Sequence, residues 1–137
     1  MTTALQTAPI ASPAILWTGR ILTALPALFL LMDGAMKLFQ PEPVLSSMAQ
    51  LGYPASLSVG LGVLLLLCVA LYLVPRTSLL GAILLTGYLG GAIAAHLRVG
   101  NPLFSHILFP VYVALLLWGG LLLRQPGLRT LLLSPHS

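Results

Sequence analysis

Hydrophobic residues run along most of this chain in long stretches, separated by short segments that hold prolines, glycines and charged residues. Four such stretches cover about residues 15–39, 56–74, 78–97 and 103–123. A helix of about 20 apolar residues, rising 1.5 Å per residue, crosses the roughly 30 Å hydrocarbon core of a bilayer. The pattern therefore predicts an all-α integral membrane protein, a four-helix antiparallel bundle that forms a single transmembrane domain over residues 1–137.

The longest connection between these stretches, residues 40–55, has a pattern of its own. Its apolar residues recur at helical spacing and share one face: Val44, Leu45, Met48 and Leu51. Gly52 and Pro54 follow, and these residue types commonly stand just beyond the end of a helix. We expect a short interfacial helix here, between spans one and two.

Composition supports membrane insertion and excludes two other classes. Hydrophobic residues make up 58% of the chain and charged residues 6%. In a soluble domain, about a quarter of all residues are charged. The six Lys and Arg residues give a pI near 9.9, but they are dispersed between the spans and form no basic stripe for nucleic acid. The lipid bilayer is the expected partner, and no separate soluble domain fits within 137 residues.

The basic residues also predict the orientation. Four lie at span ends on the side of the termini: Arg20, Arg76, Arg124 and Arg129. Two lie on the other side: Lys37 and Arg98. The excess of positive charge places both termini in the cytoplasm. Three aromatic residues, Trp17, Tyr72 and Trp118, fall at the same end and are expected to form an interfacial belt.

A polar cluster at the opposite, periplasmic end holds the candidate ligand-binding or proton-handling residues: Asp33, Lys37, His96, Arg98 and His106. Asp33 and Lys37 are four residues apart, the spacing at which side chains meet on a helix. An acid inside a membrane marks a proton, ion or substrate site by default, but a structural ion pair explains this spacing equally well. Both interpretations stay open.

His96 and His106 lie on either side of the turn between spans three and four. Such histidines can hydrogen-bond a quinone or relay protons near neutral pH, or they can simply hydrogen-bond at the membrane interface. Two histidines lack the closely spaced ligand set of a metal site, so no metal is expected. The single cysteine, Cys68, cannot carry out intramolecular dithiol exchange and is interpreted as a core residue.

Two further features concern helix packing. Gly87, Gly91 and Ala95 form a row of small residues where another helix, including one from a second copy of the chain, can approach closely. Pro110 falls early in the fourth span, where it would leave the carbonyl of His106 without its usual helical donor.

The chain resembles the DoxX-like family of small bacterial membrane proteins. The resemblance covers about residues 14–124 and rests on DGAMKLFQPEPV from Asp33, LGYP at 51–54, the long stretch from Leu71 to Tyr112, and WGGLLLR from Trp118. It implies a four-helix protein of the bacterial inner membrane. Some members of the wider family are associated with oxidoreductase complexes, including quinone-linked sulfur oxidation.

One position departs from the family pattern. Similar sequences lead us to expect an acid in the second span, as in GxxELxC, whereas residues 62–68 read GVLLLLC and Leu65 stands in its place.

Three functions remain open: a membrane subunit of a quinone-linked oxidoreductase assembly, a proton-coupled transporter, channel or small-molecule binder, and a scaffold without activity. No phosphate loop or dinucleotide fingerprint identifies an enzyme.

Overall fold

The computed structural model describes residues 12–133, and these residues form helices with no strands among them. The elements are α1 (Pro13–Phe39), α2 (Glu42–Gln50), α3 (Leu57–Leu73), α4 (Ser78–Arg98), the π-helical segment η2 (Leu103–Ile107), α5 (Phe109–Arg124) and α6 (Pro126–Leu133). The predicted all-α class is confirmed. The four long helices occupy nearly the residue ranges of the four apolar stretches.

Among residues 12–133, three segments are long and apolar enough to cross a membrane: Pro13–Phe39, Ser78–Arg98 and Leu103–Arg124. The remaining long helix, α3, is apolar but has 17 residues. At 1.5 Å per residue it spans about 26 Å, slightly less than the hydrocarbon core. Its sequence is rich in leucine, so hydrophobicity alone predicts a membrane span here as it does in the other three stretches.

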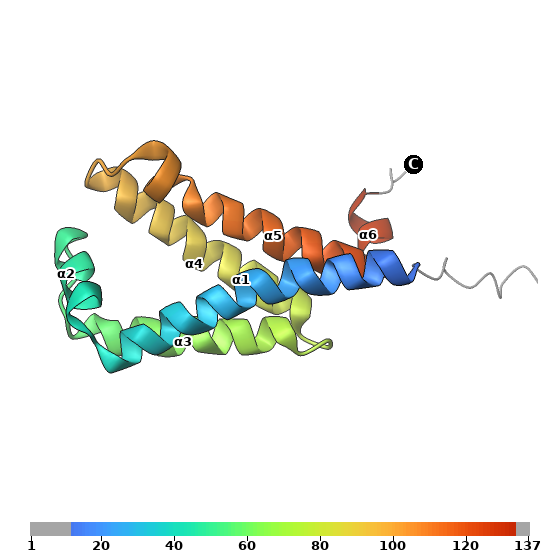
Figure 1. Cartoon of the computed structure of the whole chain (residues 1–137), viewed down its shortest axis with the longest axis horizontal. Coiled ribbons are helices and arrows are strands. Elements are labelled where there is room, and N and C mark those ends of the chain that lie inside the picture. Colours follow the sequence, from blue (N-terminus) through green and yellow to red (C-terminus); the bar gives the residue numbers. More distant parts are fainter. Residues whose placement is uncertain (1–11, 134–137) are drawn as a thin grey trace, which may run out of the picture.

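The long helices contact one another in a ring, in which α1 packs against α3 and α5, and α4 packs against the same two helices. Figure 1 shows α1 and α3 diverging from α4 and α5 toward one end, while the four helices converge at the end where α6 lies. At the diverging end, α2 stands across the opening (Figure 1). The molecule therefore has a tightly packed end and an open end.

Glycine produces the close packing of α1 against α5 at the converging end. A Cβ atom added at Gly120 would lie 2.5 Å from Thr23 Oγ1 and 3.0 Å from the Gly19 carbonyl oxygen. The shorter of these distances is below that of real Cβ contacts, so the absence of a side chain at Gly120 allows this close approach of the two backbones.

Tyr72 connects three helices inside this end. It is fully buried, its hydroxyl donates a hydrogen bond of 2.6 Å to the Leu117 carbonyl, and Thr23 Oγ1 lies 3.4 Å from the same hydroxyl. The prediction that Tyr72 belongs to an interfacial aromatic belt is therefore wrong. The glycine at position 81 brings α4 against the Tyr72 backbone, and the side chain points into the core instead.

The start of the last span also differs from the expectation. The amide groups of His106 and Ile107 both donate to the Pro102 carbonyl, which produces the π-helical turn of η2, and α5 begins afresh at Phe109. Pro110 thus lies in the first turn of α5, where its missing N–H is not needed. It begins a helix and does not kink one.

Candidate functional site

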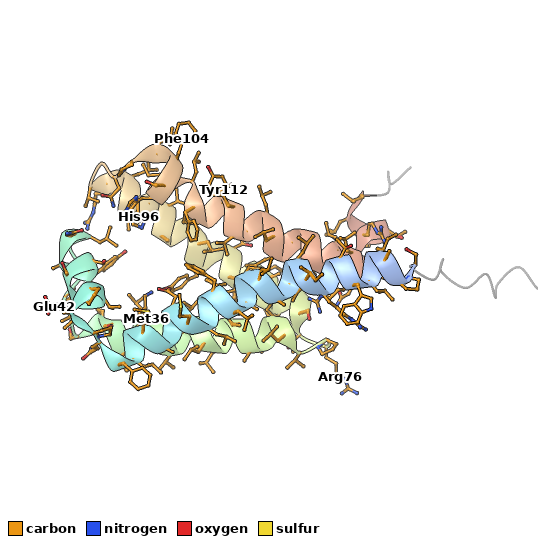
Figure 2. The ribbon with its side chains drawn as sticks, in the orientation of Figure 1. Met36, Glu42, Arg76, His96, Phe104 and Tyr112 are labelled. Atoms are coloured by element: carbon orange, nitrogen blue, oxygen red, sulfur yellow. The ribbon has the colours of Figure 1, made fainter. Side chains whose placement is uncertain are left out.

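A cavity of about 580 Å³ occupies the diverging end of the molecule. Its walls come from α1, α2, α4 and the start of α5, with Tyr53 and Leu61 closing the side next to α3. Most of the lining is apolar, including Phe29, Leu30 and Val113. Figure 2 shows Met36 on α1 and His96 on α4 at this end of the molecule, near α2. The cavity volume and lining are typical of a small-molecule site.

An ion pair on α1 supplies the charged part of the wall. Lys37 Nζ lies 2.5 Å from Asp33 Oδ2, and both residues line the cavity. The Lys37 side chain is 16% exposed and that of Asp33 35%, so the carboxylate is the more accessible partner. The predicted i to i+4 pairing is therefore present, and it faces a cavity.

The packing of α1 on α3 fixes the position of this ion pair. A Cβ atom at Gly62 would lie 2.8 Å from the Gly34 carbonyl oxygen and 3.0 Å from Lys37 Cβ, so the two helices touch next to the pair. Ser58 Oγ, fully buried at the start of α3, donates a hydrogen bond of 2.7 Å to the Lys37 carbonyl. The backbone that carries the ion pair is thus held rigidly.

His96 brings a second polar group to the cavity, from α4. The Asn101 side-chain amide donates a hydrogen bond of 2.6 Å to His96 Nδ1, which fixes the ring and leaves Nε2 as the nitrogen available to a ligand. Asn101 follows Gly100, whose positive φ of 72° turns the chain back toward the histidine. The site thus has polar groups from both α1 and α4.

The other two predicted site residues lie outside the cavity lining. The His106 ring packs edge-on against His96 with centroids 5.6 Å apart, and its Nδ1 lies 2.8 Å from Ser105 Oγ. Arg98 points elsewhere: its guanidinium donates a hydrogen bond to the Leu51 carbonyl at the end of α2. Within residues 12–133, no group of three or more His, Cys, Asp or Glu side chains could hold a metal ion.

Some lining residues were not recognised in the sequence. Tyr88 lies eight residues before His96 on α4, which is about two helical turns, so the two residues share a face and both line the cavity. Helical spacing from His96 could have identified it. Tyr53 and Phe29 also line the cavity, but they come from other segments and only the tertiary packing brings them there.

The row of small residues on α4 lines the cavity as well. Gly87, Gly91 and Ala95 all contribute to its wall, and nothing lies within 4 Å of a Cβ atom placed at either glycine. Within the described chain, the two glycines of this row therefore border open space, whereas Ala95 is buried.

A sequence model of the DoxX-like family matches residues 21–120. The chain belongs to the DoxX-like family. No curated protein and no solved structure matches it. Membership of this family, together with the apolar helices, indicates a membrane protein. The matched segment includes every residue that lines the cavity, from Phe29 to Val113.

The position where a second acid was expected has a clear structural context in this DoxX-like protein. Leu65 is 0% exposed and belongs to the core between the helices, together with Leu30, Leu85 and Val69. It does not line the cavity. A carboxylate there would need a buried partner, whereas leucine completes an apolar core. Asp33 is therefore the acid that the cavity presents.

Proposed function

We propose that this protein is a multi-pass protein of the bacterial inner membrane that binds a quinone at its periplasmic end. In this proposal α1, α3, α4 and α5 cross the bilayer as an antiparallel four-helix bundle within one domain, residues 1–137, with both termini cytoplasmic. The sequence of α3 holds no charged residue, which supports its insertion, and its 17 residues reach the lower limit of spanning length.

The proposed place of α2 is the membrane interface. Its apolar residues Val44 and Met48 border the cavity together with the C-cap residue Leu51, while Glu42, Ser46 and Gln50 are exposed. A helix with one apolar and one polar face is stable in the headgroup region, parallel to the membrane plane.

The single observation that carries the quinone proposal is the cavity, which combines apolar walls with donors from two sides. A quinone ring is planar and apolar apart from two carbonyl oxygens, and both oxygens accept hydrogen bonds. Lys37 Nζ on α1 and His96 Nε2 on α4 are the donors that would hold them, and the wall formed by Gly87 and Gly91 leaves room for a flat ring. When bound, a quinone supplies reversible acceptance of two electrons and two protons.

The proposed physiological role is that of a membrane subunit of a quinone-linked oxidoreductase assembly. His106 packs edge-on against His96 outside the cavity and is exposed, so a second titratable ring lies between His96 and water. A partner protein would supply or remove the electrons. We assign the row of small residues to the ligand wall, and contact between copies of the chain through this row is the alternative role.

Binding of a short-tailed benzoquinone to the detergent-purified full chain tests the proposal by calorimetry. Gly91→Leu places a side chain in the cavity and is expected to weaken binding more than tenfold. Gly90→Leu is the matched control, because Gly90 lies on the same helix with nothing within 4 Å of its Cβ position and does not line the cavity. No binding by the parent chain, or an equal loss in both variants, would refute the proposal.

The donors are tested with the same ligand. His96→Ala should weaken binding about fivefold to tenfold, since it removes one hydrogen bond, while His106→Ala should bind like the parent chain because that side chain lies outside the cavity. Co-purification with a soluble oxidoreductase from mildly extracted membranes tests the assembly role separately.

The accessible Asp33 carboxylate favours a second function, proton-coupled transport of a small molecule through the same site. If the protein has this function, a pH gradient drives uptake of the molecule into liposomes that contain the parent chain. The Asp33→Asn variant then shows no such uptake. Uptake that Asp33→Asn leaves unchanged would exclude it. If variants of the cavity residues change only thermal stability, the protein is a scaffold.

A further inference from the structure

The helix that covers the cavity has little packing of its own. Residues on one face of α2, among them Val44 and Met48, line the cavity, and Met48 is its one buried residue. The opposite face is exposed to solvent. A nine-residue helix is too short to be stable on its own in water, so its position depends on the contacts at its two ends.

Both ends of α2 adjoin residues with positive φ. Gln40, before its first turn, has a φ of 54°, and Gly52, after its last turn, has a φ of 81°. The Gln40 side-chain amide also donates a hydrogen bond of 3.3 Å to the Ala55 carbonyl. This bond joins the segment before α2 to the segment after it. The segment is therefore attached to the α1 and α3 side of the molecule through a narrow base.

The contact with the opposite side is made by Arg98. This residue ends α4, and its guanidinium donates to the carbonyl of Leu51, the C-cap of α2. A cation at a helix C-terminus is favoured by the helix dipole. A Cβ atom at position 52 would lie 2.7 Å from Arg98 Nη2, so glycine is required for the guanidinium to reach the carbonyl.

We propose that α2 is a lid, hinged on α1 and α3 and latched to α4 by Arg98, and that release of this latch opens the cavity to water. The latch is one hydrogen bond at an exposed site, so the open state is a minor population that loss of the latch raises. This inference goes beyond the quinone proposal, because it holds for any molecule that occupies the cavity.

Chemical labelling tests the lid without any ligand. Ala95 lines the cavity and is 7% exposed, so a cysteine placed there by Ala95→Cys reports opening through its reaction with N-ethylmaleimide. The native Cys68, 3% exposed in α3, is replaced by alanine in the full-length protein. Arg98→Gln should accelerate labelling about tenfold, as expected for the loss of one charge-assisted hydrogen bond.

Arg76→Gln is the matched control, because Arg76 is exposed in the turn at the other end of the molecule (Figure 2) and should leave the labelling rate unchanged. Gly52→Ala is the second variant: its methyl group displaces the guanidinium without removing it, and the φ of 81° also strains the backbone after α2, so labelling should accelerate at least as much. Combining Gly52→Ala with Arg98→Gln should add little, since both act on one latch.

Unchanged labelling in folded Arg98→Gln and Gly52→Ala proteins would overturn the proposal, and so would equal acceleration by Arg76→Gln. Should both latch variants fail to fold, hydrogen exchange of the unaltered chain decides. The amides of α2 must then exchange together and at least tenfold faster than those in the first turns of α3, and equal protection would overturn the lid.

Discussion

Two adjacent glycines on α5 should respond in opposite directions to the same substitution. A methyl group added at Gly120 would lie 2.5 Å from Thr23 Oγ1, 2.8 Å from the Thr23 backbone nitrogen and 3.0 Å from the Gly19 carbonyl oxygen. At Gly119 the nearest atom is Leu22 Cδ1, at 3.8 Å, which is an ordinary van der Waals contact. The two sites share one helix and differ mainly in the space beside them.

The magnitudes follow from two opposing effects. Alanine is favoured over glycine inside a helix by about 0.8 to 1 kcal/mol, and this gain applies at both positions. At Gly120 the added methyl group must push α1 and α5 apart, and overpacking of this kind costs about 1 to 3 kcal/mol. Backbone atoms make two of the three close contacts, so a side-chain rotation cannot relieve them. Gly119→Ala should therefore stabilise the protein by about 0.8 to 1 kcal/mol. At Gly120 the cost offsets or exceeds this gain, and Gly120→Ala should destabilise the protein by up to about 2 kcal/mol.

Reversible unfolding by sodium dodecyl sulfate in mixed micelles, followed by circular dichroism, measures both values under one condition. The difference between the two variants is more informative than either value alone, because the helix propensity is the same in both. If Gly120→Ala is as stable as Gly119→Ala, then α1 and α5 do not approach each other at the converging end as closely as these distances require.

The remaining predictions use the same unfolding assay. Tyr72→Phe removes the hydrogen bond to the Leu117 carbonyl without changing the shape of the side chain, and it should lower the free energy of unfolding by about 1 kcal/mol; no change would mean that the bond contributes nothing. Lys37→Met leaves the Asp33 carboxylate without its partner and should destabilise by about 1 to 2 kcal/mol, below the loss for a fully buried pair because Asp33 is partly exposed. Adding Asp33→Asn to Lys37→Met should restore part of this loss, and a double variant that is less stable than Lys37→Met would contradict an isolated ion pair.

The sequence predicted the features that depend on the residues of a single helix. The apolar stretches located the long helices, and the spacing of Asp33 and Lys37 predicted their contact, because both follow from the helical repeat. The short helix after α1 was also anticipated from its apolar face. The DoxX-like resemblance was confirmed over residues 21–120.

Features that depend on packing between helices could not be predicted in this way. Tyr72 stands near the end of its helix, as an interfacial residue would, and only the approach of α4 at Gly81 explains its burial. The hydrogen bond of Arg98 to Leu51 depends on the positive φ of Gly52, which turns the chain after α2. In an all-apolar span, periodicity barely encodes which face meets a neighbour, so these contacts have no signal in the sequence.

Small residues have different structural effects at the two ends of the molecule. Two straight helices that cross at an angle are close only near the crossing point, and here the closest approach of α1 and α5 is at Gly19, Thr23 and Gly120. Gly87 and Gly91 lie in the middle and the second half of α4 and line the cavity. Helix α2 stands across the diverging end (Figure 1). Larger side chains at positions 87 and 91 would occupy part of the cavity. Their small size therefore creates space at the diverging end, whereas the small size of Gly120 allows contact at the converging end.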